Sequence, residues 1–274
     1  MPTDEQSPTP RQVRRAALKQ LLRAALKVAI DTVSVRFARR QAVSFTGAGQ
    51  SIRGWFYHSR SDDKTPGVLL LPTAMGLTPH DHAFAARLAR AGFTTLVIAY
   101  SKRTTGAVIN DGLRRKHLEQ IVVAGWHMLQ NNATVDRTRT AVIGLSLGGY
   151  FAIHLAAAVK EFPPKAVALY YGMYALAGSD LMRLHAPLLL LQGEDDDLDF
   201  VTNAKRVHEL AARDGRPWQA VFYPDTGHQF DLFEPSGAAA RDAWERTVMF
   251  LRQHLDSSKL SEVEKTKVAL KDGV

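Results

Sequence analysis

The segment VIGLSLGGYFAIHLAAA, residues 142–158, decides how this chain is interpreted, because it sets a serine between two glycines where two patterns meet. The residues before Ser146, TAVIG, form an apolar run typical of a buried strand, and those after it have helical periodicity. A sharp strand-to-helix turn needs small neighbours, which Gly144 and Gly148 supply. Two interpretations of Ser146 follow: an ordinary glycine-rich turn, or a nucleophile presented at the end of a strand.

The same alternation of strand and helix extends along most of the chain. Strand-like apolar runs occupy 67–72, 94–100, 139–145, 165–171, 187–192 and 217–223. Helical periodicity occupies 82–91, 109–131, 147–160, 200–213 and 237–255. This order predicts an α/β fold with a mostly parallel central sheet covered by helices on both faces. Residues 42–59 predict two further strands around a glycine-containing turn, and no insertion is long enough for a separate lid domain.

Length and composition agree with one large globular domain. The chain has 274 residues, 46% of them hydrophobic, which is ample for a core. It has no cysteine, which excludes disulfides, thiolate nucleophiles and cysteine-based zinc sites. No apolar run reaches the roughly 18–20 residues of a spanning helix, and the polar start has no secretory pattern. We therefore expect a cytoplasmic protein, with peripheral binding to the inner face of the membrane as the alternative.

The basic charge is confined to one segment. Residues 11–40 hold nine basic side chains and one acidic side chain, which equals the whole net charge of +8. The basic residues of this segment are Arg11, Arg14, Arg15, Lys19, Arg23, Lys27, Arg36, Arg39 and Arg40. Five of them, from Arg11 to Lys27, recur every four residues (Arg11, Arg15, Lys19, Arg23 and Lys27). This spacing predicts an amphipathic helix that lies on an anionic membrane, packs on its own domain or forms a homodimer contact. The nearly balanced body argues against a nucleic-acid partner. The predicted division is therefore 1–40 as disordered lead and basic helix, 41–256 as the α/β domain and 257–274 as charged tail.

A serine nucleophile needs a base held by an acid, and on an α/β sheet these follow in the order Ser, Asp or Glu, His. After Ser146, the run PLLLLQGEDDDLDF ends a predicted strand in four consecutive carboxylates, 194–197. The later run VFYPDTGHQF ends another strand in a turn that carries His228. Of the ten histidines, His228 is the one in a turn directly after a late strand and downstream of the acidic turn. Each feature alone suits a solvated loop, but their order supports a hydrolase.

These segments resemble the α/β-hydrolase fold, and within it the dienelactone hydrolase family. The similar segments, in order, are LLLPTAMGLTPHDHAFAARLARAGFTTLVIAY, VDRTRTAVIGLSLGGY, AVALYYGM, QGEDDDLDF and FYPDTGHQF. The resemblance covers about residues 66–255 and implies a hydrolase of esters or lactones that needs no cofactor and no metal.

Carried over residue by residue, the resemblance assigns the nucleophile to Ser146 and the base to His228. The Gly-x-x-Asp spacing from Gly193 assigns the acid to Asp196, with Asp195 and Asp197 one residue away as rivals. The backbone N–H groups of Ala74 and Leu147 would form the oxyanion hole, with Leu147 at the start of a helix.

Three departures from the family pattern bear on the substrate. The family nucleophile is typically Cys, and a Glu in its oxyanion loop corresponds here to Thr73. An Arg that helps bind a substrate carboxylate corresponds to Leu232, while Arg103 loosely matches a second such Arg. We therefore expect a neutral ester or lactone as substrate.

The expected substrate pocket contains Thr73, Met75, Arg103 and Tyr171. Tyr170, Met173 and Tyr174 follow the same strand as Tyr171, and all of these side chains could equally belong to the core. The tripeptide His80-Asp81-His82 suggests a metal only weakly, and Asp81 as the N-cap of a helix from residue 82 is the simpler interpretation. Alternative functions are a thioesterase or peptidase on the same fold, or a non-catalytic hydrolase-like protein attached by its basic helix.

Overall fold

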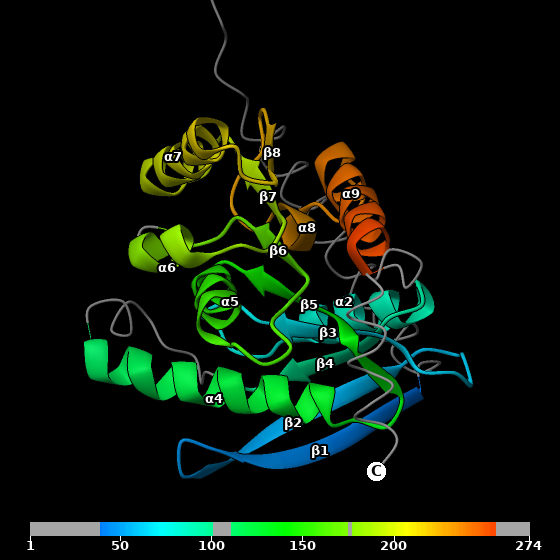
Figure 1. Cartoon of the computed structure of the whole chain (residues 1–274). Coiled ribbons are helices and arrows are strands. Elements are labelled where there is room, and N and C mark those ends of the chain that lie inside the picture. Colours follow the sequence, from blue (N-terminus) through cyan, green and yellow to red (C-terminus); the bar gives the residue numbers. More distant parts are fainter. Residues whose placement is uncertain (1–38, 101–110, 175–176, 256–274) are drawn as a thin grey trace, which may run out of the picture.

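The computed structural model describes residues 39–100, 111–174 and 177–255, which form one eight-stranded sheet with helices on both faces (Figure 1). The strands are β1 (Arg39–Gly47), β2 (Gln50–His58), β3 (Thr65–Leu71), β4 (Thr94–Ile98), β5 (Val135–Leu145), β6 (Ala166–Tyr170), β7 (Leu188–Gly193) and β8 (Trp218–Tyr223). Their order across the sheet is β1-β2-β4-β3-β5-β6-β7-β8. β1, β2 and β4 pair antiparallel, and every other pair is parallel. The predicted fold class is confirmed.

The helices divide between the two faces. They are α2 (Pro79–Arg90), α4 (Gly112–Gln130), α5 (Leu147–Ala158), α6 (Gly178–Arg183), α7 (Leu198–Asp214), α8 (Phe230–Phe233) and α9 (Ala238–Leu255). α4, α5, α6 and α7 cover one face, and α2, α8 and α9 cover the other (Figure 1). Successive strand side chains point to opposite faces, so Leu69 joins the core under α4 and α5 while Leu70 joins the core under α2 and α9.

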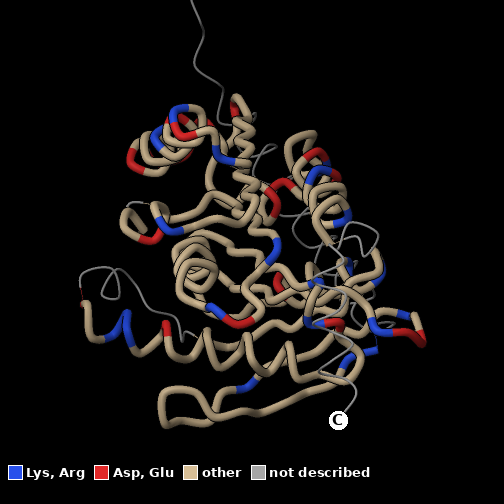
Figure 2. The backbone as a smooth tube through the Cα atoms, in the orientation of Figure 1, with Lys and Arg blue, Asp and Glu red and all other residues tan. Residues whose placement is uncertain are grey.

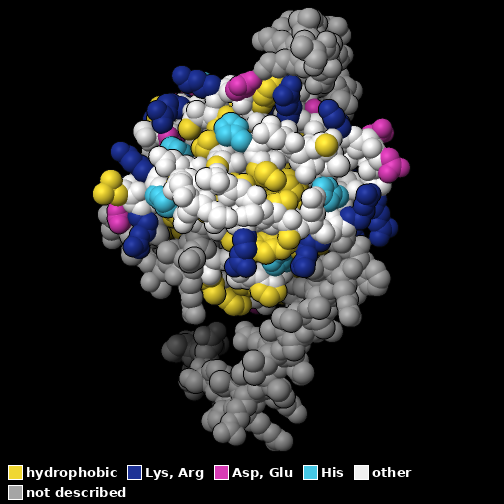
Figure 3. Space-filling view, turned by 90° about the horizontal axis from the view of Figure 1, so that it is seen from below, with side chains coloured by type: hydrophobic (Ala, Val, Ile, Leu, Met, Phe, Trp, Pro, Cys, Tyr) yellow, Lys and Arg dark blue, Asp and Glu magenta, His cyan; other side chains and the backbone are white. Residues whose placement is uncertain are grey.

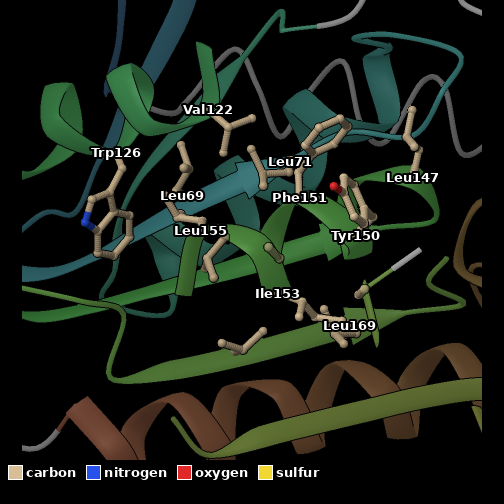
Figure 4. Packing of buried hydrophobic residues seen from close by; sticks show 14 of the residues in the cluster. Leu69, Leu71, Val122, Trp126, Leu147, Tyr150, Phe151, Ile153, Leu155 and Leu169 are labelled. Atoms are coloured by element: carbon tan, nitrogen blue, oxygen red, sulfur yellow. The ribbon is translucent and has the colours of Figure 1, made fainter. Parts of the chain in front are cut away.

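The helix that follows Ser146 is buried on nearly every side. Leu147, Phe151 and Leu155 of α5 pack among strand leucines and residues of α4 (Figure 4). A helix surrounded in this way has an apolar residue at most positions, as the run YFAIHLAAA shows. α5 is therefore a rigid support for the turn from which it starts.

Two expectations about element boundaries were wrong. The basic helix predicted for 11–40 cannot include its last two residues, because Arg39 and Arg40 pair with His58 and Tyr57 in the β1–β2 hairpin. No glycine or proline marks that change in the sequence, and only the pairing with β2 determines it. The rest of that predicted helix lies outside the described residues, as does the tail from 256.

The second correction concerns the start of α2. Its N-cap is Thr78 and Pro79 opens the helix, so Asp81 is not the N-cap but the third helical residue. The Asp81 carboxylate accepts hydrogen bonds from the N–H and hydroxyl of Thr78, at 2.7 and 2.6 Å. Proline suits a first helical position because no intrahelical acceptor awaits its missing N–H.

Charges of both signs are spread over the described body (Figure 2). On the face seen from below, hydrophobic side chains form separate patches among polar ones (Figure 3). No helix within 39–100, 111–174 or 177–255 is long and apolar enough to cross a membrane.

Candidate active site

Ser146 occupies a strained turn between β5 and α5. Its φ of 51° and ψ of −114° lie outside the regions that L-residues normally adopt, at a cost of about 1–3 kcal/mol. The turn is held by backbone hydrogen bonds: the N–H of Ser146 donates to Tyr170 O, and its carbonyl accepts from Gly149 and Met173. This geometry presents the Ser146 side chain at the carboxyl end of the sheet, where open α/β folds bind ligands.

Glycine at 144 and 148 lets three chain segments meet at this turn. A Cβ on Gly144 would approach the Gly148 carbonyl oxygen to 2.3 Å, and one on Gly148 would approach Leu71 O to 2.2 Å. Both contacts are shorter than any side chain can make. The close approach places the start of α5 directly against the chain that leaves β3 toward Ala74.

His228 links Ser146 to an acidic residue. Its Nε2 lies 3.1 Å from Ser146 Oγ, and its Nδ1 lies 2.8 Å from Asp196 Oδ2. A carboxylate only accepts hydrogen bonds, so Nδ1 carries the proton and Nε2 is left to accept the serine hydroxyl. The imidazole ring also packs against Tyr171 and Phe200, with centroid separations of 4.8 and 4.9 Å.

The structure resolves which carboxylate of the acidic run meets His228. Asp196 turns inward and its side chain is only 2% exposed, whereas Asp195 and Asp197 are exposed. Its Oδ2 also accepts from Gln192 Nε2 at 2.7 Å, and its Oδ1 from the N–H of Asp197 at 2.7 Å. These donors compensate the burial of the charge and orient the carboxylate toward His228.

Gln192 is a residue that the sequence interpretation missed. It lies on β7, is fully buried, and is the one polar side chain in the strand LLLLQG. A lone amide in a doubly buried strand signals a polar partner at the strand's carboxyl end, and here that partner is Asp196.

Backbone donors lie beside Ser146. Leu147 is the first residue of α5, where the helix itself provides no acceptor for its N–H. Ala74 lies in a tight turn closed by the bond from Gly76 N–H to Thr73 O, at 3.1 Å. Tyr100 holds the start of this loop, because its hydroxyl donates to Pro72 O at 2.7 Å. The chain thus brings Ala74 and Leu147 to the same end of the sheet.

The residues expected to form the substrate pocket have different surroundings. Thr73 is buried, and its Oγ1 accepts from the Met75 N–H, so it shapes the loop. Met75 is 50% exposed at the surface of that loop. Tyr171 is fully buried, its hydroxyl donates to Asp231 and its ring packs against His228, so its side chain does not line an open pocket. Arg103 lies outside the described residues.

The histidines of the tripeptide 80–82 point to separate partners. His80 Nε2 lies 2.9 Å from Asp231 Oδ2, and His82 Nδ1 lies 2.8 Å from the Tyr57 hydroxyl. Burial lowers the pKa of His82 to about 4, so this ring is neutral at ordinary pH. Within the described part of the chain, no three His, Cys, Asp or Glu side chains are arranged to hold a metal ion.

Known proteins that are similar to this chain agree with the fold and with a hydrolase of the ester and lactone type. Residues 52–255 match the model of the dienelactone hydrolase family. The carboxymethylenebutenolidase of Rhodococcus opacus is 28% identical over 222 residues, which cover 73% of this chain and 86% of that protein. A probable 2-oxo-3-(5-oxofuran-2-ylidene)propanoate lactonase of Bradyrhizobium is 25% identical, with 70% and 85% covered.

Solved structures share the fold at lower identity. A putative dienelactone hydrolase from Klebsiella pneumoniae superposes with a TM-score of 0.65 at 18% identity, covering 78% of this chain and 98% of that one. The dienelactone hydrolase-like phosphotriesterase P91 from metagenomic libraries gives 0.67 at 24%, covering 78% and 98%. Because the family model matches most of its length, this chain belongs to the dienelactone hydrolase family and is a hydrolase of the ester and lactone type.

Proposed function

We propose that this protein hydrolyses a carboxylic ester or lactone through an acyl-enzyme on Ser146. The observation that carries the proposal is the chain of hydrogen bonds from Asp196 through His228 to Ser146. His228 takes the hydroxyl proton as Ser146 Oγ attacks the substrate carbonyl, and Asp196 stabilises the imidazolium that forms. The N–H groups of Ala74 and Leu147 donate to the oxyanion. The alcohol leaves with the proton from His228, and water then attacks the acyl-enzyme with His228 again as base. The ester bond to Ser146 Oγ breaks, the carboxylic acid is released, and His228 returns the proton to Ser146 Oγ.

Replacement of Ser146 tests this proposal. Ser146→Ala should lower kcat for an activated short-chain ester by about 10³- to 10⁶-fold, because the nucleophile is lost while the fold is kept. A fluorophosphonate probe should label the parent protein and not the variant. Activity within tenfold of the parent, with a matching circular dichroism spectrum, would remove Ser146 from the mechanism and favour a non-catalytic role for this turn.

We propose further that the preferred substrate is neutral. Leu232 takes the place of a carboxylate-binding Arg, and four exposed carboxylates surround Asp196 in the turn and at the start of α7: Glu194, Asp195, Asp197 and Asp199. An anionic substrate would meet repulsion there and would bury a charge at a cost of several kcal/mol.

A substrate panel tests the charge preference. Neutral esters should exceed acid-bearing lactones in kcat/KM, and thioesters and peptide derivatives in the same panel define the acyl group. Faster hydrolysis of dienelactone than of simple esters would contradict the argument and assign the carboxylate to another cation, with Arg103 the first to replace.

We also propose a cytoplasmic location. The lack of cysteine supports it, because a chain without disulfide bonds has none that a reducing compartment could break. We assign to residues 11–38 either the attachment to an anionic membrane or the contact with a second copy of the chain. Neither alters the chemistry, and both are tested by truncation below.

A further inference from the structure

Beside the proposed active site lie three buried polar side chains that the mechanism does not use. His80 Nε2 is 2.9 Å from Asp231 Oδ2, and the Tyr171 hydroxyl donates to Asp231 Oδ1 at 2.7 Å. His80, Asp231 and Tyr171 are 9%, 7% and 0% exposed. Here these three residues are called the cross-brace.

The cross-brace joins the segments that carry the site. His80 is on the first turn of α2, a few residues beyond the loop of Ala74. Asp231 is three residues after His228, on α8. Tyr171 directly follows Tyr170, whose carbonyl accepts the N–H of Ser146. One carboxylate therefore ties the oxyanion loop, the histidine turn and the serine turn together.

Tyr171 connects the cross-brace to His228. The two rings lie 4.8 Å apart at 61° to each other. The Tyr171 backbone is itself constrained, since its φ is +39° and its N–H donates to Leu191 O at 2.8 Å. The bond to Asp231 holds the far end of the ring, so the surface on which the imidazole rests cannot rotate away.

The groups around the cross-brace keep its hydrogen bonds in place. Burial raises the pKa of the Tyr171 hydroxyl, with the Asp231 carboxylate raising it further, so this group stays a donor. Asp81 is the neighbouring buried carboxylate on α2, and it is engaged by Thr78. A buried carboxylate bound by several donors resists displacement, because a lost bond leaves a desolvated oxygen behind.

We propose that the cross-brace is a positioning network for His228, which keeps the imidazole in line with Ser146 and couples its turn to the oxyanion loop. The proposal rests on the serine-hydrolase function proposed above. Interactions that align reacting groups act on the transition state more than on substrate binding, so their loss lowers kcat with little change in KM.

The decisive variant is Tyr171→Phe, which keeps the ring and removes only the bond to Asp231. Its matched control is Tyr223→Phe, which removes a similar bond, 2.8 Å to Asp242, from a tyrosine that makes no ring contact with His228. Tyr171→Phe should lower kcat about tenfold, within the range known for small misplacements of reacting groups, and leave KM within about twofold. Tyr223→Phe should leave both within about twofold.

A second pair of variants tests the His80 end by rescue. His80→Leu removes the group that bonds Asp231 and should reduce kcat about as much as Tyr171→Phe. His80→Gln restores an N–H donor and should recover most of kcat, a result that a purely space-filling role for His80 would not give. If His80→Leu does not fold in a thermal melt, Tyr171→Phe and its control decide alone.

The outcomes separate this proposal from the function on which it rests. Turnover that survives Ser146→Ala overturns the proposed function itself. Loss of turnover in Ser146→Ala, with Tyr171→Phe and Tyr223→Phe equal in kcat, overturns only the cross-brace. A rise in KM at constant kcat for Tyr171→Phe also overturns it, because that result assigns the residue to substrate binding.

Discussion

Asp196 shows how one residue in a row of similar ones acquires a distinct role. Its neighbours Asp195 and Asp197 carry the same group but are exposed, while Asp196 is bonded by His228 and Gln192. Charge alone does not distinguish the three carboxylates. They differ in the orientation of their side chains, because the backbone after Gly193 turns only the Asp196 side chain toward His228.

This difference predicts unequal effects of the same substitution. Asp196→Asn should lower kcat about 10³- to 10⁴-fold, because an amide does not hold His228 in the required tautomer. Asp195→Asn and Asp197→Asn serve as controls and should change kcat by a few-fold at most. The measurement is kcat on a neutral ester at constant pH. Equal small effects at all three positions would place the acid elsewhere.

At the scale of elements, a histidine joins three helices beside the sheet. His154 of α5 bonds Asp180 of α6 through Nδ1 at 2.9 Å, and its Nε2 lies 3.6 Å from Glu119 of α4. Burial lowers the pKa of His154, but the bond to Asp180 and the charges of Glu119 and Asp180 outweigh it, so the pKa is raised. The bond to His154 is the main reason that the pKa of Asp180 is lowered.

The raised pKa predicts a stability that depends on pH. The contribution of His154 is complete below its unfolded pKa of about 6.5 and is lost as pH rises through the higher folded value. That of Asp180 is present above about pH 4 and lost as pH falls through its lowered value. Both are therefore present near pH 5.5.

His154→Gln should consequently lower Tm more at pH 5.5 than at pH 9, by roughly 2–4 °C for each kcal/mol lost in a domain of this size. The matched control is His117→Gln, since His117 is exposed on α4 and bonds Gln50. Thermal melts at the two pH values provide the measurement. A Tm difference for His154→Gln that is the same at both would show that its partners do not hold the charged form.

At the scale of the whole molecule, chemistry and basic charge lie in different parts of the chain. Ser146, Asp196 and His228 belong to the described body, whereas most of the basic excess lies within residues 11–38. β1 begins at Arg39, so a truncation that leaves this strand intact removes residues 1–38.

Removal of residues 1–38 should leave kcat/KM on a neutral ester within about twofold. If the segment binds membrane, the full chain should sediment with anionic vesicles and the truncated chain should not, since each Lys or Arg near the surface contributes about 1 kcal/mol. Binding should weaken with salt and be absent with neutral vesicles. Vesicle binding by the truncated chain equal to that of the full chain would exclude this role. A lower Tm would instead indicate packing on the domain, and a change in oligomeric state a dimer contact.

The sequence by itself determined the elements and the order of the chemical groups. Apolar runs and helical periods predicted the α/β sheet, and the turns at Ser146 and His228 were identifiable because each follows a strand and carries its own turn residues. Such signals are local, so they can be interpreted within ten or so residues. The tertiary structure decided the rest: the choice of Asp196, the pairing that starts β1 at Arg39 and the meeting of His80, Tyr171 and Asp231. These depend on the register between strands and on contacts between residues 32 to 151 positions apart, which no local pattern encodes.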